Sequence, residues 1–226
     1  SEKEELEKRL RKKLEEIKEL VERYKRRLEE LLRRHREELK EIEKRLEDLE
    51  RKIEELDVPE RVKKLLRDLI RVLREWLRRS HDLLRRLLEV SKKALEDILR
   101  LLEKLLKEIK DLEDEDRLEE RIDKVLKDLK RIDDRVREMV KEVLERDDRL
   151  ARDVKKKVEE VLRELEEAGV SEEVKKIIEE LLRLAEEVLR RNKRLIEALL
   201  ELHEDEFRKV EEIIKELSEE AKRASK

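Results

Sequence analysis

The chain has 226 residues, of which 58% are charged and 37% hydrophobic, and 64 basic residues against 67 acidic ones give a formal net charge of −3. This balance excludes a general electrostatic attraction to nucleic acid or acidic membranes, and the absence of Cys excludes disulfides, thiolate nucleophiles and Cys-ligated zinc. One Gly, one Pro and an excess of Leu, Glu, Lys and Arg indicate long helices. Because the apolar residues recur at helical spacing, we expect a packed core and not a disordered chain.

The first part of the chain carries one continuous apolar stripe from Leu10 to Leu56. Its steps alternate between three and four residues, a period close to that of a helix with a shallow left-handed supercoil. Pro59 ends this pattern, because the residue before a proline is pushed out of the helical region, whereas proline suits the first turn of a new helix. The sequence therefore predicts a first helix over 2–56.

Two further connections divide the rest of the chain. Gly169 suits a left-handed residue after a helix, and Ser171 can cap the next helix. Near 113–116 there is neither Gly nor Pro, but Asp114 or Asp116 can cap a helix, and Asp116 with Glu119 has the spacing of a capping box. A continuous helix through this point is the alternative to a turn. The predicted helices after the first are 59–112, 116–168 and 171–224.

Four segments of similar length joined by short connections predict an all-α fold, a single-chain antiparallel up-down-up-down four-helix bundle. We expect one domain over 1–226, with long, near-straight helices of about 80 Å each. The second and fourth helices have wider apolar faces than the others, and a rhombic cross-section would bury these faces against each other. The alternative is an exposed groove for another helix or a second copy of the chain. The residues that widen these faces include Leu95, Leu102, Ile109, Leu182, Ile196 and Phe207.

Polar residues interrupt the apolar stripes at one height. His35 and His81 lie equally far from the first connection, and Asp147 and Asn192 lie within one residue of equal distance from the third. Counting from the middle connection brings the two pairs to the same level, where Ser80 is also found. The sequence thus predicts one buried polar layer, to which every helix contributes.

A second, looser polar layer is predicted from the same counting. Tyr24 and Ser91 lie at similar distances from the first connection, and Ser91 and His203 occupy matching heights. Glu206 lies one helical turn further along.

Two chemical interpretations compete for the first layer. His35, His81 and Asp147 could supply two imidazoles and a carboxylate to zinc or iron. Hydroxyl and amide groups, however, serve mutual hydrogen bonding and not metal ligation, so Ser80 and Asn192 favour a hydrogen-bond network. Di-iron bundles use Glu-x-x-His pairs, and here the residues three before each His are Leu32, Arg78 and Leu200.

No motif in the sequence indicates catalysis or a cofactor. A triad of Ser80, His81 and Asp147 is possible by height, but we expect a filled core without a substrate cleft. Trp76 lies on the apolar line of its helix, so we expect it to fill the core. A single Gly leaves no glycine-rich phosphate loop.

Nucleic-acid and membrane binding are also not expected. The basic runs 25–27 and 155–157 are flanked by acids and lack an aromatic platform. No apolar run is long enough for a transmembrane helix, and the charged residues 1–5 are unlike a signal peptide. We therefore expect a soluble chain that requires no partner, with a homo-oligomer or a helical partner as the open alternatives.

The sequence resembles computationally designed, or de novo, helical bundles with buried hydrogen-bond networks. The likeness rests on a near-uniform Leu, Ile and Val core, a Glu, Lys and Arg surface, core polar residues on each helix, and idealised connections at 57–60 and 168–171. It covers the whole chain and implies a hyperstable scaffold with no natural substrate.

Overall fold

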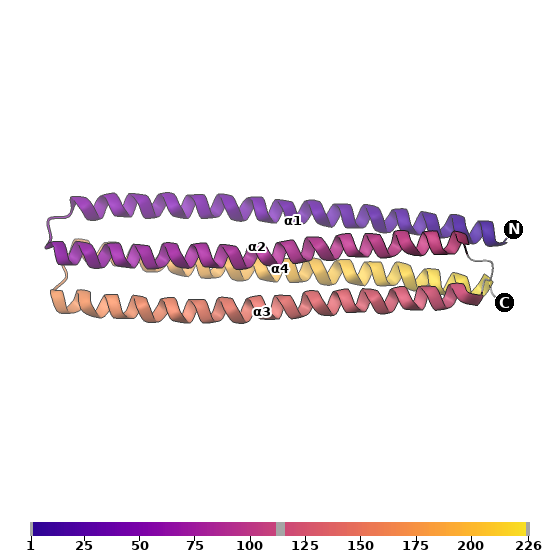
Figure 1. The fold of residues 1–226 in the computed structure, drawn as a ribbon. Coiled ribbons are helices and arrows are strands. Elements are labelled where there is room, and N and C mark those ends of the chain that lie inside the picture. The colour runs from indigo at the N-terminus through magenta and orange to yellow at the C-terminus, as the bar shows by residue number, and fades with distance from the viewer. Residues whose placement is uncertain (1, 112–115, 225–226) are drawn as a thin grey trace. The chain divides into compact units, whose positions relative to one another are not determined.

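The computed structural model describes residues 2–111 and 116–224, which form four helices (Figure 1). These are α1 (Glu2–Glu55), α2 (Glu60–Asp111), α3 (Asp116–Ala168) and α4 (Glu172–Ala224). Each end lies within one residue of the predicted boundary, and no strand occurs in the described part of the chain. The predicted all-α four-helix fold is confirmed. None of the helices, over these residues, is apolar enough for its length to cross a membrane.

The connection between α1 and α2 provides partners for some backbone groups at each helix end. The carbonyl of Pro59 accepts hydrogen bonds from the amides of Val62 at 3.0 Å and Lys63 at 3.3 Å, so the helix starts directly after the proline. Lys63 also donates from Nζ to the carbonyl oxygen of Glu54 at 2.8 Å. A cation thus pairs with a free carbonyl at the negative end of α1.

The connection between α3 and α4 has the predicted geometry. Gly169 has a φ of 80°, in the left-handed region, and its amide donates to the carbonyl of Glu166 at 3.2 Å. Ser171 Oγ accepts from the amide of Val174 at 3.4 Å, which confirms the predicted cap. The turn predicted near 113–116 lies outside the described residues, apart from Asp116, at which α3 begins.

The helices contribute to two compact units, each of which contains a segment of all four helices. Unit 1 consists of Ser1–Glu30, Leu87–Lys141 and Ala198–Lys226, and unit 2 of Leu31–Arg86 and Glu142–Glu197.

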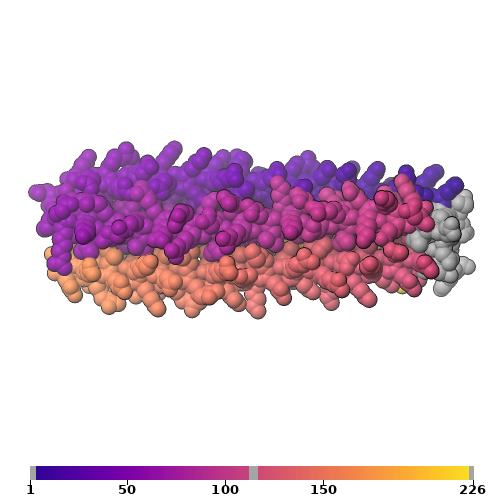
Figure 2. Space-filling model, in the orientation of Figure 1, coloured from indigo at the N-terminus to yellow at the C-terminus, as the bar shows by residue number. Residues whose placement is uncertain are grey.

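In unit 2, ion pairs show that neighbouring helices are antiparallel. Arg45 of α1 pairs with Glu187 of α4 at 2.8 Å, and Lys52 pairs with Glu180 at 3.9 Å, so the numbering rises along one helix as it falls along the other. Arg74 of α2 forms ion pairs with Glu43 and Glu50 of α1. Side chains of α2 (purple) also lie directly against those of α3 (orange) in this unit (Figure 2).

Unit 1 has the same neighbour relationships. Most of its ion pairs are largely exposed, so each contributes only about 0–1 kcal/mol, and the apolar core supplies most of the stability. The interhelical pairs include Lys13–Glu216 (α1 to α4), Lys25–Glu96 (α1 to α2), Arg121–Glu108 (α2 to α3) and Arg137–Glu204 (α3 to α4).

The wide apolar faces of α2 and α4 are mostly buried within the units. Burial of one such side chain stabilises the fold by about 1.5–3 kcal/mol. In the described residues, the exposed large apolar side chains are Leu144 of α3 and Leu182 of α4, at 37% and 36% exposure. The buried members of the wide faces include Leu95, Leu102, Ile109, Ile196 and Phe207.

Candidate functional site

Three members of the first predicted layer form a buried hydrogen-bond chain in unit 2. Ser80 Oγ of α2 donates to Asp147 Oδ1 of α3 at 3.2 Å, and it accepts from Asn192 Nδ2 of α4 at 2.5 Å. All three side chains are at least nine-tenths buried. A hydroxyl has one proton and two lone pairs, so Ser80 links a carboxylate to an amide and thereby connects three helices.

The electrostatics of Asp147 follow from its position in this chain. Burial raises the pKa of its carboxyl, and the hydrogen bond from Ser80 opposes this effect. The charge of Asp148 adds to the increase, whereas Lys193 counteracts it. The Ser80 hydroxyl therefore offsets part of the cost of keeping a carboxylate away from water.

The two histidines of the layer form a separate pair in the same unit. The rings of His35 (α1) and His81 (α2) are stacked, with centroids 5.3 Å apart and an interplanar angle of 23°. His35 Nε2 and His81 Nδ1 are buried and have no hydrogen-bond partner in the described part of the chain. Burial lowers the pKa of His35 to about 4, with a smaller contribution from His81. Burial also lowers the pKa of His81.

This geometry bears on both chemical alternatives. Ser80 donates its proton to Asp147 and not to His81, so the order of contacts in a catalytic triad is not formed. Among residues 2–111 and 116–224, no group of three or more His, Asp or Glu side chains is placed to hold a metal ion. The arrangement supports hydrogen bonding between helices.

In unit 1, two of the three residues of the second predicted layer, Tyr24 and His203, have carboxylate partners. The Tyr24 hydroxyl of α1 donates to Asp205 Oδ2 of α4. Burial raises the pKa of Tyr24, and this hydrogen bond raises it further. His203 Nε2 of α4 donates to Asp133 Oδ1 of α3 at 2.9 Å. Ser91 is buried on α2 and takes part in neither bond.

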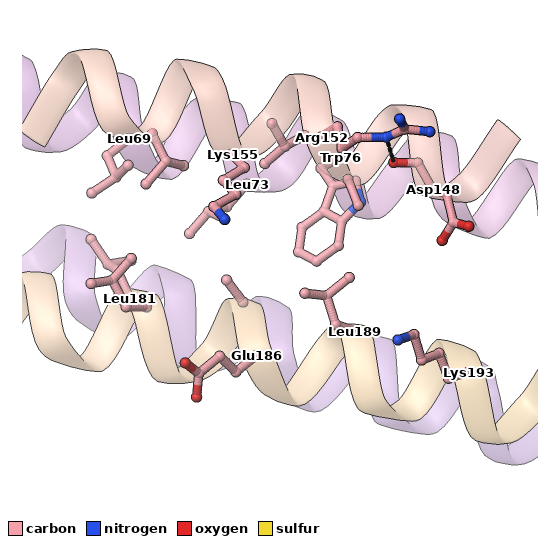
Figure 3. Close-up of a pocket in the computed structure, with 15 residues that line it drawn as sticks. Leu69, Leu73, Trp76, Asp148, Arg152, Lys155, Leu181, Glu186, Leu189 and Lys193 are labelled. Atoms are coloured by element: carbon pink, nitrogen blue, oxygen red, sulfur yellow. Dashed lines mark hydrogen bonds between the residues drawn. The ribbon is translucent and has the colours of Figure 1, made fainter. Parts of the chain in front are cut away.

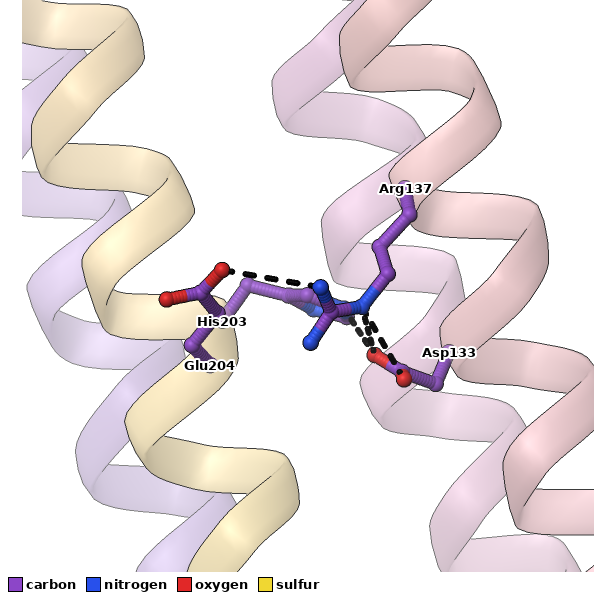
Figure 4. Close-up of polar contacts among 4 residues, drawn as sticks. All are labelled: Asp133, Arg137, His203 and Glu204. Carbon is purple, nitrogen blue, oxygen red and sulfur yellow. Dashed lines mark hydrogen bonds and ion pairs between the residues drawn. The ribbon is translucent and has the colours of Figure 1, made fainter.

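The His203 contact belongs to a larger polar cluster (Figure 4). Arg137 donates from Nε to Asp133 Oδ2 at 3.1 Å and lies 3.6 Å from Glu204. Burial lowers the pKa of His203, whereas the hydrogen bond to Asp133 raises it. The cluster therefore joins α3 to α4 at the edge of the core of unit 1.

Glu206 is a buried carboxyl in the interior of unit 1. It is 3% exposed, and its Oε1 has no hydrogen-bond partner in the described residues. Burial raises its pKa to about 8. Glu206 is therefore protonated near neutral pH in the folded protein.

A cleft of about 560 Å³ opens in unit 2 between α2, α3 and α4 (Figure 3). The expectation of a filled core is wrong here. The alanines Ala151 and Ala185 line the cleft from α3 and α4, where larger apolar residues would fill the space. The exposed Leu182 is also part of the lining.

Trp76 borders this cleft and a second cavity. It is 2% exposed, and with Val154 it also lines a cavity of about 270 Å³ between α2 and α3. The Nε1 atom of its indole is buried without an acceptor in the described part of the chain. Trp76 is thus a buried core residue, as predicted, but the core around it is incompletely packed.

Sequence reasoning missed Asp133, Asp205 and the cleft. The aspartates lie at the edges of the apolar stripes, where acidic residues are expected to face solvent. Glu206 carries a clearer signal, because it lies seven residues after Leu199 and four before Val210, on the same buried face.

Fold and site together define the class as an all-α protein of four long helices with buried hydrogen bonds between them. No protein-family model matches the chain, and no curated protein matches it. A solved structure described as a computationally designed three helix bundle aligns over 95% of this chain and 98% of its own, with 18% identity. The TM-score of that alignment is 0.23, too low to establish a shared fold.

Proposed function

We propose that the protein is a structural scaffold, a designed helical bundle without natural catalytic activity, in which buried polar groups specify how the helices pair. The observation that carries this proposal is the hydrogen-bond chain through Ser80, Asp147 and Asn192. Each member satisfies another only in one relative alignment of α2, α3 and α4.

The physical basis is a penalty on wrong pairings. A slip of one helix by a turn would separate Asn192 from Ser80 and leave buried polar groups without partners, at about 1–3 kcal/mol for each group. Apolar layers tolerate such slips better, because Leu packs against Leu in many alignments. The buried chain therefore favours one register over its competitors more than it raises total stability.

Two other observations support a designed scaffold. Gly169 takes a left-handed conformation after α3 and Ser171 caps α4, and acidic and basic residues are interleaved along all four helices. The cleft of unit 2 is lined by neither His nor Ser, so it offers no hydroxyl nucleophile with an imidazole base.

The test replaces the three members of the hydrogen-bond chain by apolar residues, in the triple variant Ser80→Leu, Asp147→Leu and Asn192→Leu. We expect its unfolding midpoint in guanidinium to equal or exceed that of the parent. Light scattering after size exclusion should show several species, where the parent shows one.

A matched control adds the same apolar residues at exposed positions of the same helices, with Arg78→Leu, Glu145→Leu and Arg194→Leu. If the control forms the same mixture, added hydrophobicity explains the result. If the variant with Leu at 80, 147 and 192 forms a single species and is less stable than the parent, the polar hydrogen-bond chain serves stability and not the choice of helix pairing.

Assembly is a second candidate function, for which Leu182 is the specific observation. This side chain is part of the wide apolar face of α4 but is 36% exposed, so a helical partner or a second copy could cover it. Assembly would be favoured if the solution mass of the parent rises with concentration while Leu182→Glu keeps the mass of a monomer.

A further inference from the structure

The cleft of unit 2 changes character along its length (Figure 3). Leu69 and Leu181 lie at one end, and Asp148 and Lys193 lie at the other, with Trp76 between them. A molecule that matched this lining would have an apolar body and one polar end.

The charges at the polar end favour an anion. Arg152 and Lys193 are found there (Figure 3), and Lys155 is a third cation in the lining. Arg152 donates from Nε to the backbone carbonyl of Asp148 at 3.4 Å. No ion pair is formed by Lys155 or Lys193 within the described residues, and the acids of the lining are Asp148 and Glu186.

The size of the cleft favours a small molecule over a helix. Its volume of about 560 Å³ lies within the usual range of about 300–1,000 Å³ for small-molecule sites. The lining of α4 runs from Leu181 to Lys193, which corresponds to about 18 Å at the helical rise per residue. A partner helix would need a longer groove to bury its apolar face.

We propose that this cleft is a binding site for a small amphiphilic anion. The apolar or aromatic body packs against Leu69, Trp76 and Leu181, and the anionic group faces Arg152 and Lys193. This site is independent of the polar chain through Ser80, so either proposal can fail without the other.

The test uses 8-anilinonaphthalene-1-sulfonate, which combines an aromatic body with one sulfonate. Trp76 is the single Trp of the chain, so energy transfer from its indole to the dye reports binding beside it. We expect saturable transfer with one dye per chain. N-phenyl-1-naphthylamine, which lacks the sulfonate, should bind more weakly.

A first variant removes the space. Ala185→Phe should reduce the dye affinity at least tenfold while the helical circular dichroism is retained. Ala151→Leu fills the same cleft from α3 and gives the same readout if Ala185→Phe does not fold. Undiminished affinity in a folded, filled variant would overturn the proposal.

A second variant tests the charge. Lys193→Glu should weaken binding of the sulfonate dye by about twofold to fivefold, the scale of surface ion pairs, and leave binding of the uncharged dye unchanged. Lys176→Glu, an exposed position of α4 outside the lining, should change neither. Equal effects on both dyes would overturn the assignment of the anionic end.

The solution mass of the parent protein tests the remaining alternative, in which a second copy of the chain occupies the cleft. A dimer that is broken by Ala185→Phe, together with no dye binding to the parent, would mean that a second copy fills the cleft. A monomer that binds one dye supports the proposal.

Discussion

Asn192 of α4 donates a 2.5 Å hydrogen bond to Ser80 of α2 in the interior of unit 2. These helices are not consecutive in the chain, so no connection fixes their relative height. Because Ser80 also donates to Asp147, the bond links the alignment of α4 to that of α3.

Asp147→Ala should destabilise the protein by about 1–3 kcal/mol, because the buried Ser80 hydroxyl loses its acceptor. Asp147→Asn keeps an amide oxygen for Ser80 and carries no charge. Since burial raises the pKa of Asp147, the Asn variant should be at least as stable as the parent at pH 7. Guanidinium unfolding measures both, with exposed Asp148→Ala as a control expected within about 0.5 kcal/mol of the parent. An unchanged Asp147→Ala would contradict this role of the carboxylate.

His35 should make the protein less stable as the pH falls from 6.5 toward 4. Its pKa is lowered from 6.5 in the unfolded chain to about 4 in the fold, so in this window the unfolded state binds the proton and the folded state does not. The contribution of neutral His35 to the free energy of unfolding is complete above pH 6.5. As the pH falls below 6.5, it declines by at most about 1.4 kcal/mol per pH unit. His35→Phe should flatten this part of the stability curve.

Proton NMR checks the same assignment directly. All three histidines should titrate below their ordinary value, since burial lowers the pKa of His35, His81 and His203. An ordinary titration of His35 near pH 6.5 would show that its ring is open to water.

Glu206→Gln should stabilise the protein at pH 8 and have little effect at pH 5. The folded pKa of about 8 lies above the ordinary 4.5, so the stability that Glu206 contributes is complete below pH 4.5 and is lost as the pH rises to 8. The variant removes that loss, which is at most about 1.4 kcal/mol per pH unit. Unfolding at both pH values measures the difference, with exposed Glu201→Gln as control. A pH-independent difference would refute the shifted carboxyl.

Gly169→Ala should cost about 1–2 kcal/mol, the penalty for an L-residue in the left-handed region. Apart from Gly169 and its two chain neighbours, no atom of the described residues lies within 4 Å of the position that a Cβ would take, so the cost comes from the backbone at φ 80° and not from a clash. Gly169→Asn should cost less, because Asn tolerates this region better. Thermal unfolding compares the two, and equal losses would indicate another cause.

The helices could be predicted to within one residue because their ends depend on local chemistry. Pro59 and Gly169 act on their own backbone, and the apolar spacing between them identifies the buried face without knowledge of any partner. The candidates for the polar layer followed from the same local facts, since equal distances from a connection give equal heights.

The contacts themselves could not be predicted. Asp133 and Asp205 keep part of their surface in solvent, with side chains 16% and 35% exposed, so their sequence positions look like ordinary surface acids. The cleft depends on Ala151 and Ala185 facing one space from two helices. That coincidence is set by the distance and rotation between helices, which a single helix pattern does not contain.

The continuity of the four helices has a consequence for cooperativity. The chain passes from one unit to the other after Glu30, Arg86, Lys141 and Glu197, and each of these residues lies inside a helix. Helical hydrogen bonds therefore run through every crossing, and a boundary between folded and unfolded chain would break them in four helices at once. Melting that starts in either unit has no loop at which to stop, so the units are expected to unfold together although each has its own core.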